Sequence, residues 1–425
     1  MKKILILISI TLFFLCISCE EKIQSSSEFA LINVDKNYSF KELILQDFMD
    51  VEYVPLETTD EFICQGFVQD VTENYIIVRN FLRTGDIFIF DRKGKAVKKI
   101  NRVGQGGEEY VLLLEALYDE ETDDLFVSDL GRKIMIYDKE GNYKRYFKAR
   151  ENGKYKSIRN FDRNYLICYD GNVSNDGETN GQNFLLVSKQ DGSSKTIHIP
   201  FEKSIITAVI SKTFQPGVTW GITPQTDFPL VPYKGKWILM EPSCDTLYTL
   251  SPDLVKKPFI VREPSIQNMT PEVFLFLSII TDRYYFMETV KREYDFADKK
   301  GYPSTNLVYD KEENKIYRSI VYNEDYTIKE DVQMNYIPLN QDIASCHIIP
   351  AHELVVAYQK GWLKEGRLKE ISATLDDESN PVLMFYKHKK KGIDATFNNK
   401  ISFATDIRHA CFEWNINRVS WLGTW

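Results

Sequence analysis

The chain has 425 residues, of which 43% are hydrophobic and 27% charged, and its formal net charge is −8. This length and apolar content suffice for a large globular domain with an extensive core. The negative charge argues against nucleic acid and anionic membrane surfaces as partners, because both would repel an acidic protein.

The first residues have the features of a secretory leader. Lys2 and Lys3 precede an apolar run over 4–17 that is too short to span a bilayer comfortably. The segment that follows, Leu15-Cys16-Ile17-Ser18-Cys19, resembles a bacterial lipobox, although Cys16 stands where Leu is usual. An ordinary signal peptide cut nearby is the alternative.

We therefore expect a lipoprotein whose soluble part is held at a membrane by acyl chains on Cys19. The expected segments are a signal peptide over 1–18 and a lipidated Cys with a polar tether over 19–45.

A strand followed by a tight turn recurs along the chain. Runs 87–90 and 134–137 are short, apolar and β-prone, the length of strands rather than helices. Each leads into a turn in which Asp can bond nearby backbone N–H groups and Gly can adopt positive φ. The two turns are Asp91-Arg-Lys-Gly94 and Asp138-Lys-Glu-Gly141, and weaker copies of the unit lie at 185–192, 247–253, 307–314 and 382–386.

The first two turns lie 47 residues apart, from Asp91 to Asp138. A repeat of roughly 40–50 residues that holds several short strands, with six such units in the chain, predicts an all-β, six-bladed β-propeller with four-stranded antiparallel blades over 46–391. Strand–Asp–x–x–Gly turns occur in any β-rich protein, but the recurring spacing favours the propeller. The segment 51–57 alternates as a strand, with Pro55 suited to an edge. We expect this strand to join the last blade and close the ring.

The chain resembles the six-bladed β-propeller lipoproteins of Bacteroides and related bacteria over residues 30–390. Three segments carry the resemblance: Gly104-Gln-Gly106-Gly107-Glu-Glu109-Tyr110, which lacks that family's Pro, Ser243-Cys-Asp245-Thr246-Leu-Tyr248, and Asn380-Pro381-Val382-Leu383. The resemblance implies the fold and a location in the cell envelope, as an outer-membrane lipoprotein on either the periplasmic or the surface side. It implies no reaction, because that family has no established shared activity.

Three aromatic residues are the candidates for ligand contact. Trp220, Tyr233 and Trp237 lie among Pro and Gly in the expected fourth blade. Aromatic side chains in loops at a propeller face can stack on a sugar or a peptide. Packing between neighbouring blades is the alternative.

No metal or cofactor is expected. His347 and His352 have neither helical nor strand spacing for a shared metal. The Gly-rich stretch 104–107 is not followed by the Lys-Ser/Thr of a phosphate loop. Five scattered cysteines, at 64, 168, 244, 346 and 411, indicate free thiols.

The end of the chain departs from the strand pattern. Leu368, Ile371 and Leu375 have helical spacing and predict a short amphipathic helix over 364–377. The segment 392–425 shows no repeat and is expected to be a C-terminal extension.

The sequence therefore favours a lipid-anchored, non-catalytic propeller that binds a glycan, a peptide or an envelope protein. Two alternatives remain at this point. Acidic residues converging on the ring centre would make it a hydrolase or lyase acting on a glycan. A broad apolar rim would make it a structural subunit of an envelope complex.

Overall fold

The computed structural model describes residues 29–80, 83–151, 153–171, 183–215 and 218–389. The expected signal peptide, Cys19 and the extension 392–425 lie outside these residues. The chain divides into two compact units, Met1–His388 and Lys389–Trp425, and the description below concerns the first.

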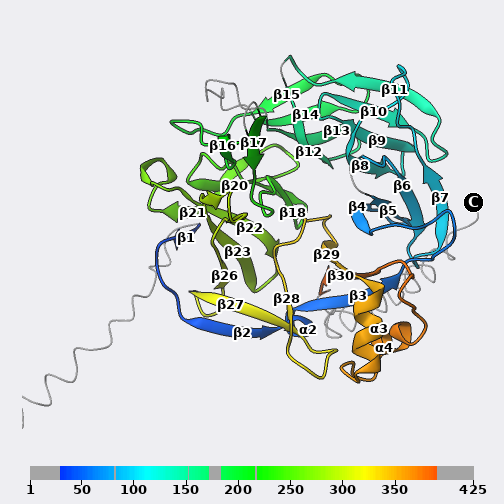
Figure 1. Cartoon of the computed structure of the whole chain (residues 1–425). Helices are drawn as coiled ribbons and strands as arrows, with labels where there is room; N and C mark the ends of the chain where they lie inside the picture. The colour runs from blue at the N-terminus through cyan, green and yellow to red at the C-terminus, as the bar shows by residue number, and fades with distance from the viewer. Residues whose placement is uncertain (1–28, 81–82, 152, 172–182, 216–217, 390–425) are drawn as a thin grey trace, which may run out of the picture. The chain divides into compact units, whose positions relative to one another are not determined.

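The described residues form a six-bladed β-propeller, which confirms the predicted fold class (Figure 1). Each of the first three blades is a separate four-stranded antiparallel sheet in chain order. Their strands are β4 (Phe67–Val71), β5 (Tyr75–Arg79), β6 (Ile87–Asp91), β7 (Ala96–Ile100); β8 (Leu113–Asp119), β9 (Asp124–Asp129), β10 (Lys133–Tyr137), β11 (Tyr143–Lys148); and β12 (Tyr155–Asn160), β13 (Tyr165–Asp170), β14 (Phe184–Ser188), β15 (Ser194–Ile197).

The fourth and fifth blades have the same antiparallel core with further strands added. The core strands are β18 (Leu230–Tyr233), β19 (Lys236–Leu239), β20 (Thr246–Leu250), β21 (Lys256–Glu263); and β22 (Val273–Ile280), β23 (Tyr284–Lys291), β26 (Ser304–Asp310), β27 (Lys315–Asn323). Strand β28 (Glu330–Val332) also pairs with β27. The connections carry two hairpins and a 3-10 turn: β16 (Val209–Gln215) with β17 (Val218–Ile222), β24 (Tyr294–Asp295) with β25 (Lys300–Gly301), and η1 (Ile266–Asn268).

The sixth blade is completed by both ends of the propeller. Its innermost segment pairs through a single bridge between Pro338 and Ser345 with β29 (Ile343–Ile349). Next come β30 (Val382–His388) and β3 (Met49–Pro55), which are antiparallel. The pairing of β3 with β30 confirms that the strand predicted near 51–57 closes the ring.

Two helices cover the sixth blade. Helix α4 (Arg367–Ser372) lies within the predicted helical segment 364–377, whereas α3 (Ala351–Gln359) was not predicted. A single turn, α2 (Leu45–Phe48), precedes β3.

The N-terminal segment that was expected to be a tether instead continues the sheets. Strand β1 (Ala30–Asn33) pairs in parallel with β21 of the fourth blade, and β2 (Phe40–Ile44) pairs in parallel with β27 of the fifth. Residues 30–55 therefore run along the outer edges of three consecutive blades, as the blue ribbon in Figure 1 shows. We call β1, β2 and β3 the N-terminal belt.

The six predicted strand–turn units are the third strands of the six blades: β6, β10, β14, β20, β26 and β30. Four of them, β6, β10, β14 and β30, are almost continuously apolar because neighbouring blades cover both of their faces, whereas β20 and β26 are partly polar. The turn chemistry is also as predicted, since Gly94 and Gly141 have φ of +83° and +85°. The Asp91 carboxylate accepts hydrogen bonds from the backbone N–H groups of Lys93 and Lys95 at 2.8 and 2.9 Å.

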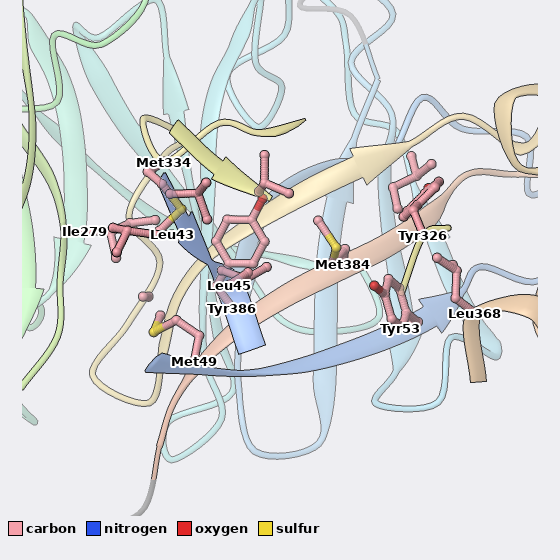
Figure 2. Close-up of a cluster of buried hydrophobic side chains, with 14 of the residues drawn as sticks. Leu43, Leu45, Met49, Tyr53, Ile279, Tyr326, Met334, Leu368, Met384 and Tyr386 are labelled. Carbon is pink, nitrogen blue, oxygen red and sulfur yellow. The ribbon is translucent and has the colours of Figure 1, made fainter. Parts of the chain in front are cut away.

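The core consists of apolar layers between neighbouring blades, including a layer between the sixth and first blades. The layer between the fifth and sixth blades is the largest (Figure 2). It combines Leu43 and Leu45 of the N-terminal segment with Met384 and Tyr386 of β30, and Leu368 of α4 lies at its margin. The belt is therefore part of the core.

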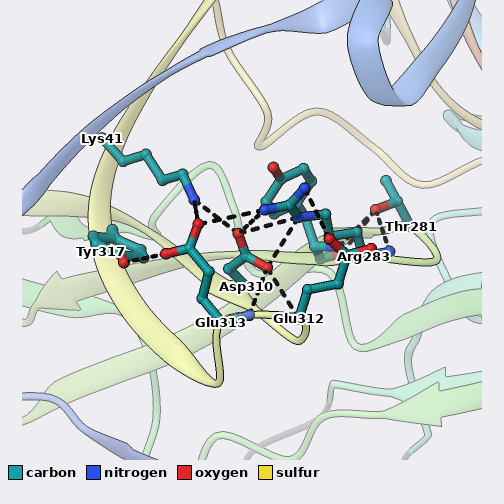
Figure 3. Close-up of polar contacts among 8 residues, drawn as sticks. Lys41, Thr281, Arg283, Asp310, Glu312, Glu313 and Tyr317 are labelled. Carbon is teal, nitrogen blue, oxygen red and sulfur yellow. Dashed lines mark hydrogen bonds and ion pairs between the residues drawn. The ribbon is translucent and has the colours of Figure 1, made fainter.

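An ion-pair network also fastens the belt to the fifth blade (Figure 3). The Asp310 carboxylate is fully buried and accepts from Lys41 Nζ at 2.7 Å and from the Arg283 guanidinium at 2.8 to 3.1 Å. Lys41 also pairs with Glu313 at 2.6 Å. The two cations hold the pKa of Asp310 below its usual range despite its burial.

Candidate functional site

Strands alternate in direction within each blade, so the connections fall on two opposite faces. The short-turn face carries tight turns between first and second strands, such as 72–74, 234–235 and 281–283. The long-loop face carries the crossings between blades, including 101–112, 149–154 and 198–229. Long loops on a rigid scaffold are where binding residues concentrate.

The centre of the short-turn face is crossed by polar contacts. Gln341, in the first turn of the sixth blade, accepts from the backbone N–H of Gly235 at 2.8 Å and donates to the carbonyl of Lys236 at 3.1 Å. The fourth and sixth blades are not neighbours in the ring, so this bridge spans its inner edge. Lys234 pairs with Asp282 of the blade between them. These contacts tie the inner turns of the fourth, fifth and sixth blades to one another on this face.

Tyr233 lies at the end of β18 on this same face. Its hydroxyl donates to the carbonyl of Thr281 at 3.0 Å, and burial raises its pKa. The His388 ring lies edge-on at 6.0 Å between centroids. Tyr233 is thus half-buried in contacts between blades.

The structure does not bring Tyr233 together with the other two predicted aromatics. Trp237 is only 6% exposed and packs in the core between the third and fourth blades, which is the packing alternative to ligand contact. Trp220 belongs to β17 on the long-loop side, and its side chain lies outside the described residues.

A polar cluster lies on the long-loop face where the third and fourth blades meet. Lys156, at the start of β12, pairs with Asp227 at 2.5 Å. The same Asp227 oxygen accepts from Thr207 Oγ1 at 2.8 Å. The Asp227 side chain is 5% exposed, whereas that of Lys156 is 37% exposed and reaches solvent. Asp227 thus positions a cation that remains accessible.

Behind this pair lies a second buried carboxylate. Glu241 accepts from Asn183 Nδ2 at 2.8 Å and from the Tyr169 hydroxyl at 3.2 Å. Burial raises the pKa of Glu241, and nearby carboxylates together with burial hold that of Tyr169 well above its ordinary value. We call Lys156, Asp227, Thr207, Glu241, Asn183 and Tyr169 the long-loop cluster.

The loop that supplies Thr207 is fixed by a contact with the fifth blade. The Tyr302 hydroxyl donates to the carbonyl of Thr207 at 3.0 Å and accepts from the N–H of Val209 at 2.9 Å. Arg292 donates to the carbonyl of Ala208 at 2.9 Å. Such supporting contacts hold the polar groups in place before any ligand arrives.

The innermost strands of the first three blades carry further paired charges. Glu115 accepts from Arg159 at 3.2 Å and from the N–H of Ile158 at 2.7 Å. Asp70 accepts from the N–H groups of Val71 and Tyr118, yet desolvation raises its pKa to about 6. These carboxylates are tied to cations or backbone donors, so they stabilise the blade contacts.

The arrangement offers fixed donors and acceptors on one face. Among the described residues, no group of three or more His, Cys, Asp or Glu side chains is placed to hold a metal ion. No helix in the same ranges is both long and apolar enough to cross a membrane.

Sequence reasoning missed Asp227, Thr207 and Glu241, because they meet only through long-range folding and share no local motif.

The protein is thus a six-bladed propeller whose long-loop face carries long connections and a cluster of polar side chains. The chain belongs to the family described as "Domain of unknown function (DUF4934)", whose profile matches residues 29–387. No curated protein matches its sequence.

Two solved structures from Bacteroides are similar. One, titled "Putative exported protein" from Bacteroides fragilis NCTC 9343, has 13% identity and a TM-score of 0.57, covering 85% of this chain and 100% of that one. The other, a DUF4221 family member from Bacteroides vulgatus, has 11% identity and a TM-score of 0.45, covering 81% and 98%. The first supports the propeller fold.

Proposed function

We propose that this protein is a non-catalytic binding propeller of the bacterial envelope, which captures a polar ligand, a glycan or a peptide, on its long-loop face. The long-loop cluster is the observation that carries the proposal. It presents Lys156 to solvent on a buried support of Asp227 and Thr207. A site whose polar groups are already fixed loses little entropy when a ligand binds.

The contacts between blades on the short-turn face support the same choice of face. A ligand approaching there would have to displace the Gln341 bridge and the Lys234–Asp282 ion pair.

The envelope location rests on the N-terminal sequence. The basic and apolar segments before Cys19 support export and lipid attachment there, which would anchor the protein at the outer membrane. The name of the Bacteroides fragilis structure agrees with export. Labelling with a radioactive fatty acid, compared between the native chain and Cys19→Ser, tests the anchor: the Ser variant should carry no label.

Calorimetry on the purified protein tests the binding site. A ligand selected from glycan and peptide arrays should bind the native protein and be recovered intact, and Lys156→Met should weaken binding at least tenfold. Lys257→Met is the control, because Lys257 is exposed on β21 of the fourth blade, away from the cluster. Equal binding by Lys156→Met would contradict the site, and a cleaved ligand would contradict the non-catalytic assignment.

A further inference from the structure

A second polar feature of the long-loop face is a cleft of about 550 Å³ between the second and third blades. This volume is within the range of small-ligand sites. Apart from Ala149 and Gly153, each of the described residues that line the cleft is charged. The charged residues are Arg132, Lys133, Lys148, Arg150, Glu151 and Lys154.

The sheet register gathers these cations. Lys133 on β10 and Lys148 on β11 are directly opposite partners, an arrangement that is unfavourable for like charges unless an anion balances them. Arg132 follows the left-handed turn at Gly131, where φ is +70°. A Cβ at Gly131 would lie 2.8 Å from the carbonyl oxygen of Tyr155, so the turn packs closely against the next blade.

Two buried carboxylates hold part of the charge in place. Asp170 accepts from Arg150 Nε at 2.7 Å, and Asp129 lies 3.6 Å from Lys133 Nζ. Both acids have side chains no more than 2% exposed, so they hold Lys133 and Arg150 in place from beneath the surface and are not available to a ligand.

The remaining cations face solvent. Arg132, Lys148 and Lys154 are exposed, and within the described ranges none of the three has a side-chain ion pair. Glu151 is the only carboxylate among those lining residues that the structure describes. The cleft is therefore a local concentration of positive charge on a chain whose net charge is −8.

We propose that this cleft binds sulfate or carboxylate groups carried by an oligosaccharide. Arg and Lys donors recognise such oxyanions through charge-assisted hydrogen bonds. Several unpaired cations spread over one cleft fit an anion-bearing chain better than a single small ion. The absence of large apolar side chains from the lining disfavours insertion into a lipid surface. The proposal does not depend on the long-loop cluster, because different residues carry it.

Calorimetry on the full-length protein tests this site with dextran sulfate oligosaccharides and with unsulfated dextran of the same length. The sulfated probe should bind, more weakly at high salt, and the unsulfated probe should not. The double variant Arg132→Glu/Lys148→Glu should lose at least tenfold in affinity, and Lys148→Gln alone should lose less. Lys93→Glu/Lys257→Glu makes the same change in net charge at two exposed lysines elsewhere and should bind like the native protein.

Further binding experiments distinguish an oligosaccharide from other carriers of an oxyanion. Binding of sodium sulfate as tightly as the oligosaccharide would overturn the proposal in favour of a free ion. Binding to phosphatidylglycerol-containing vesicles without binding to dextran sulfate would overturn it in favour of a membrane surface. An equal loss in the control double variant would show that only net charge matters. Lys156→Met should retain dextran sulfate binding, which separates this site from the long-loop cluster.

Discussion

At the scale of single residues, the Asp310 carboxylate joins the belt to the fifth blade. Lys41 comes from β2 and Arg283 from the turn after β22, so one buried acid links segments far apart in the sequence. Without the Asp310 carboxylate, Lys41 and Arg283 would lose the buried acceptor that they share and would keep only their pairs with the more exposed Glu313 and Glu312. Asp310 lies in the predicted strand–turn unit 307–314, but its contacts with Lys41 and Arg283 were not predicted.

Asp310→Asn should therefore lower the free energy of unfolding by about 2 kcal/mol, the typical contribution of a hydrogen bond to a charged group. Urea denaturation of the native and variant proteins measures this. Glu312→Gln is the matched control, because Glu312 contacts Arg283 at 2.9 Å but its side chain is 67% exposed. A comparable loss in the control would contradict the role given to Asp310.

The pH dependence of this difference follows from the lowered pKa of Asp310. The contribution of the carboxylate is fully present above the unfolded value of about 4 and is lost as pH falls through that value toward the folded one. The difference between native and Asp310→Asn should be constant from about pH 8 to 5 and shrink below about pH 4. Denaturation curves across this range test it, and a difference that grows in acid would refute the assignment.

Gly94 tests the turn chemistry that repeats in the blades. Its φ is +83°, and an added Cβ would lie 2.1 Å from the carbonyl oxygen of Pro55 at the end of β3. Gly94→Ala should cost at least about 2 kcal/mol more than Gly235→Ala. Gly235 also has positive φ, at +70°, but has open space around its Cβ position. Thermal unfolding of both variants measures the two losses of stability. Equal losses would show that contact with the Pro55 carbonyl does not destabilise Gly94→Ala.

At the scale of elements, the third strand of each blade and the closing strand β3 were predictable, whereas β1 and β2, the first two strands of the belt, were not. Strands such as β6 and β10 combine continuous apolar runs with Asp and Gly turns, so local sequence marks them. Asn314, which replaces Gly in the fifth unit, also has positive φ, at 52°. In contrast, β1 and β2 pair in parallel with strands that lie more than two hundred residues later in the chain. Parallel strands are not joined by a short turn, so no local sequence pattern predicts this pairing.

The belt should contribute measurably to stability. Deleting residues 30–44 removes buried Ile32 and Leu43 from two core layers and leaves β21 and β27 as open edges. We expect a loss of at least about 3 kcal/mol and a tendency to associate through the exposed edges. Chemical denaturation and light scattering measure the two effects. A monomeric deletion variant of unchanged stability would show that the segment acts only as a tether.

At the scale of the whole molecule, fold class and ring closure could be inferred from repeats, but the candidate site could not. The long-loop cluster depends on Lys156, Asp227 and Glu241 meeting across two blades, which only the ring geometry brings about. The aromatic residues were chosen by composition, and composition does not reveal that Trp237 faces the core. The basic cleft could not be predicted from net charge either, because net charge does not show where on the folded chain the positive side chains gather.

Hydrogen–deuterium exchange with and without an array-selected ligand tests the central claim most directly, provided that the ligand is afterwards recovered and weighed by mass spectrometry. We predict protection in the long-loop segments 153–160 and 201–229, no change in the short turns 72–74, 234–235 and 281–283, and a ligand of unchanged mass. Protection centred on the short turns would place the binding site on the short-turn face and would contradict the proposal. A ligand recovered in fragments would show that the propeller is an enzyme.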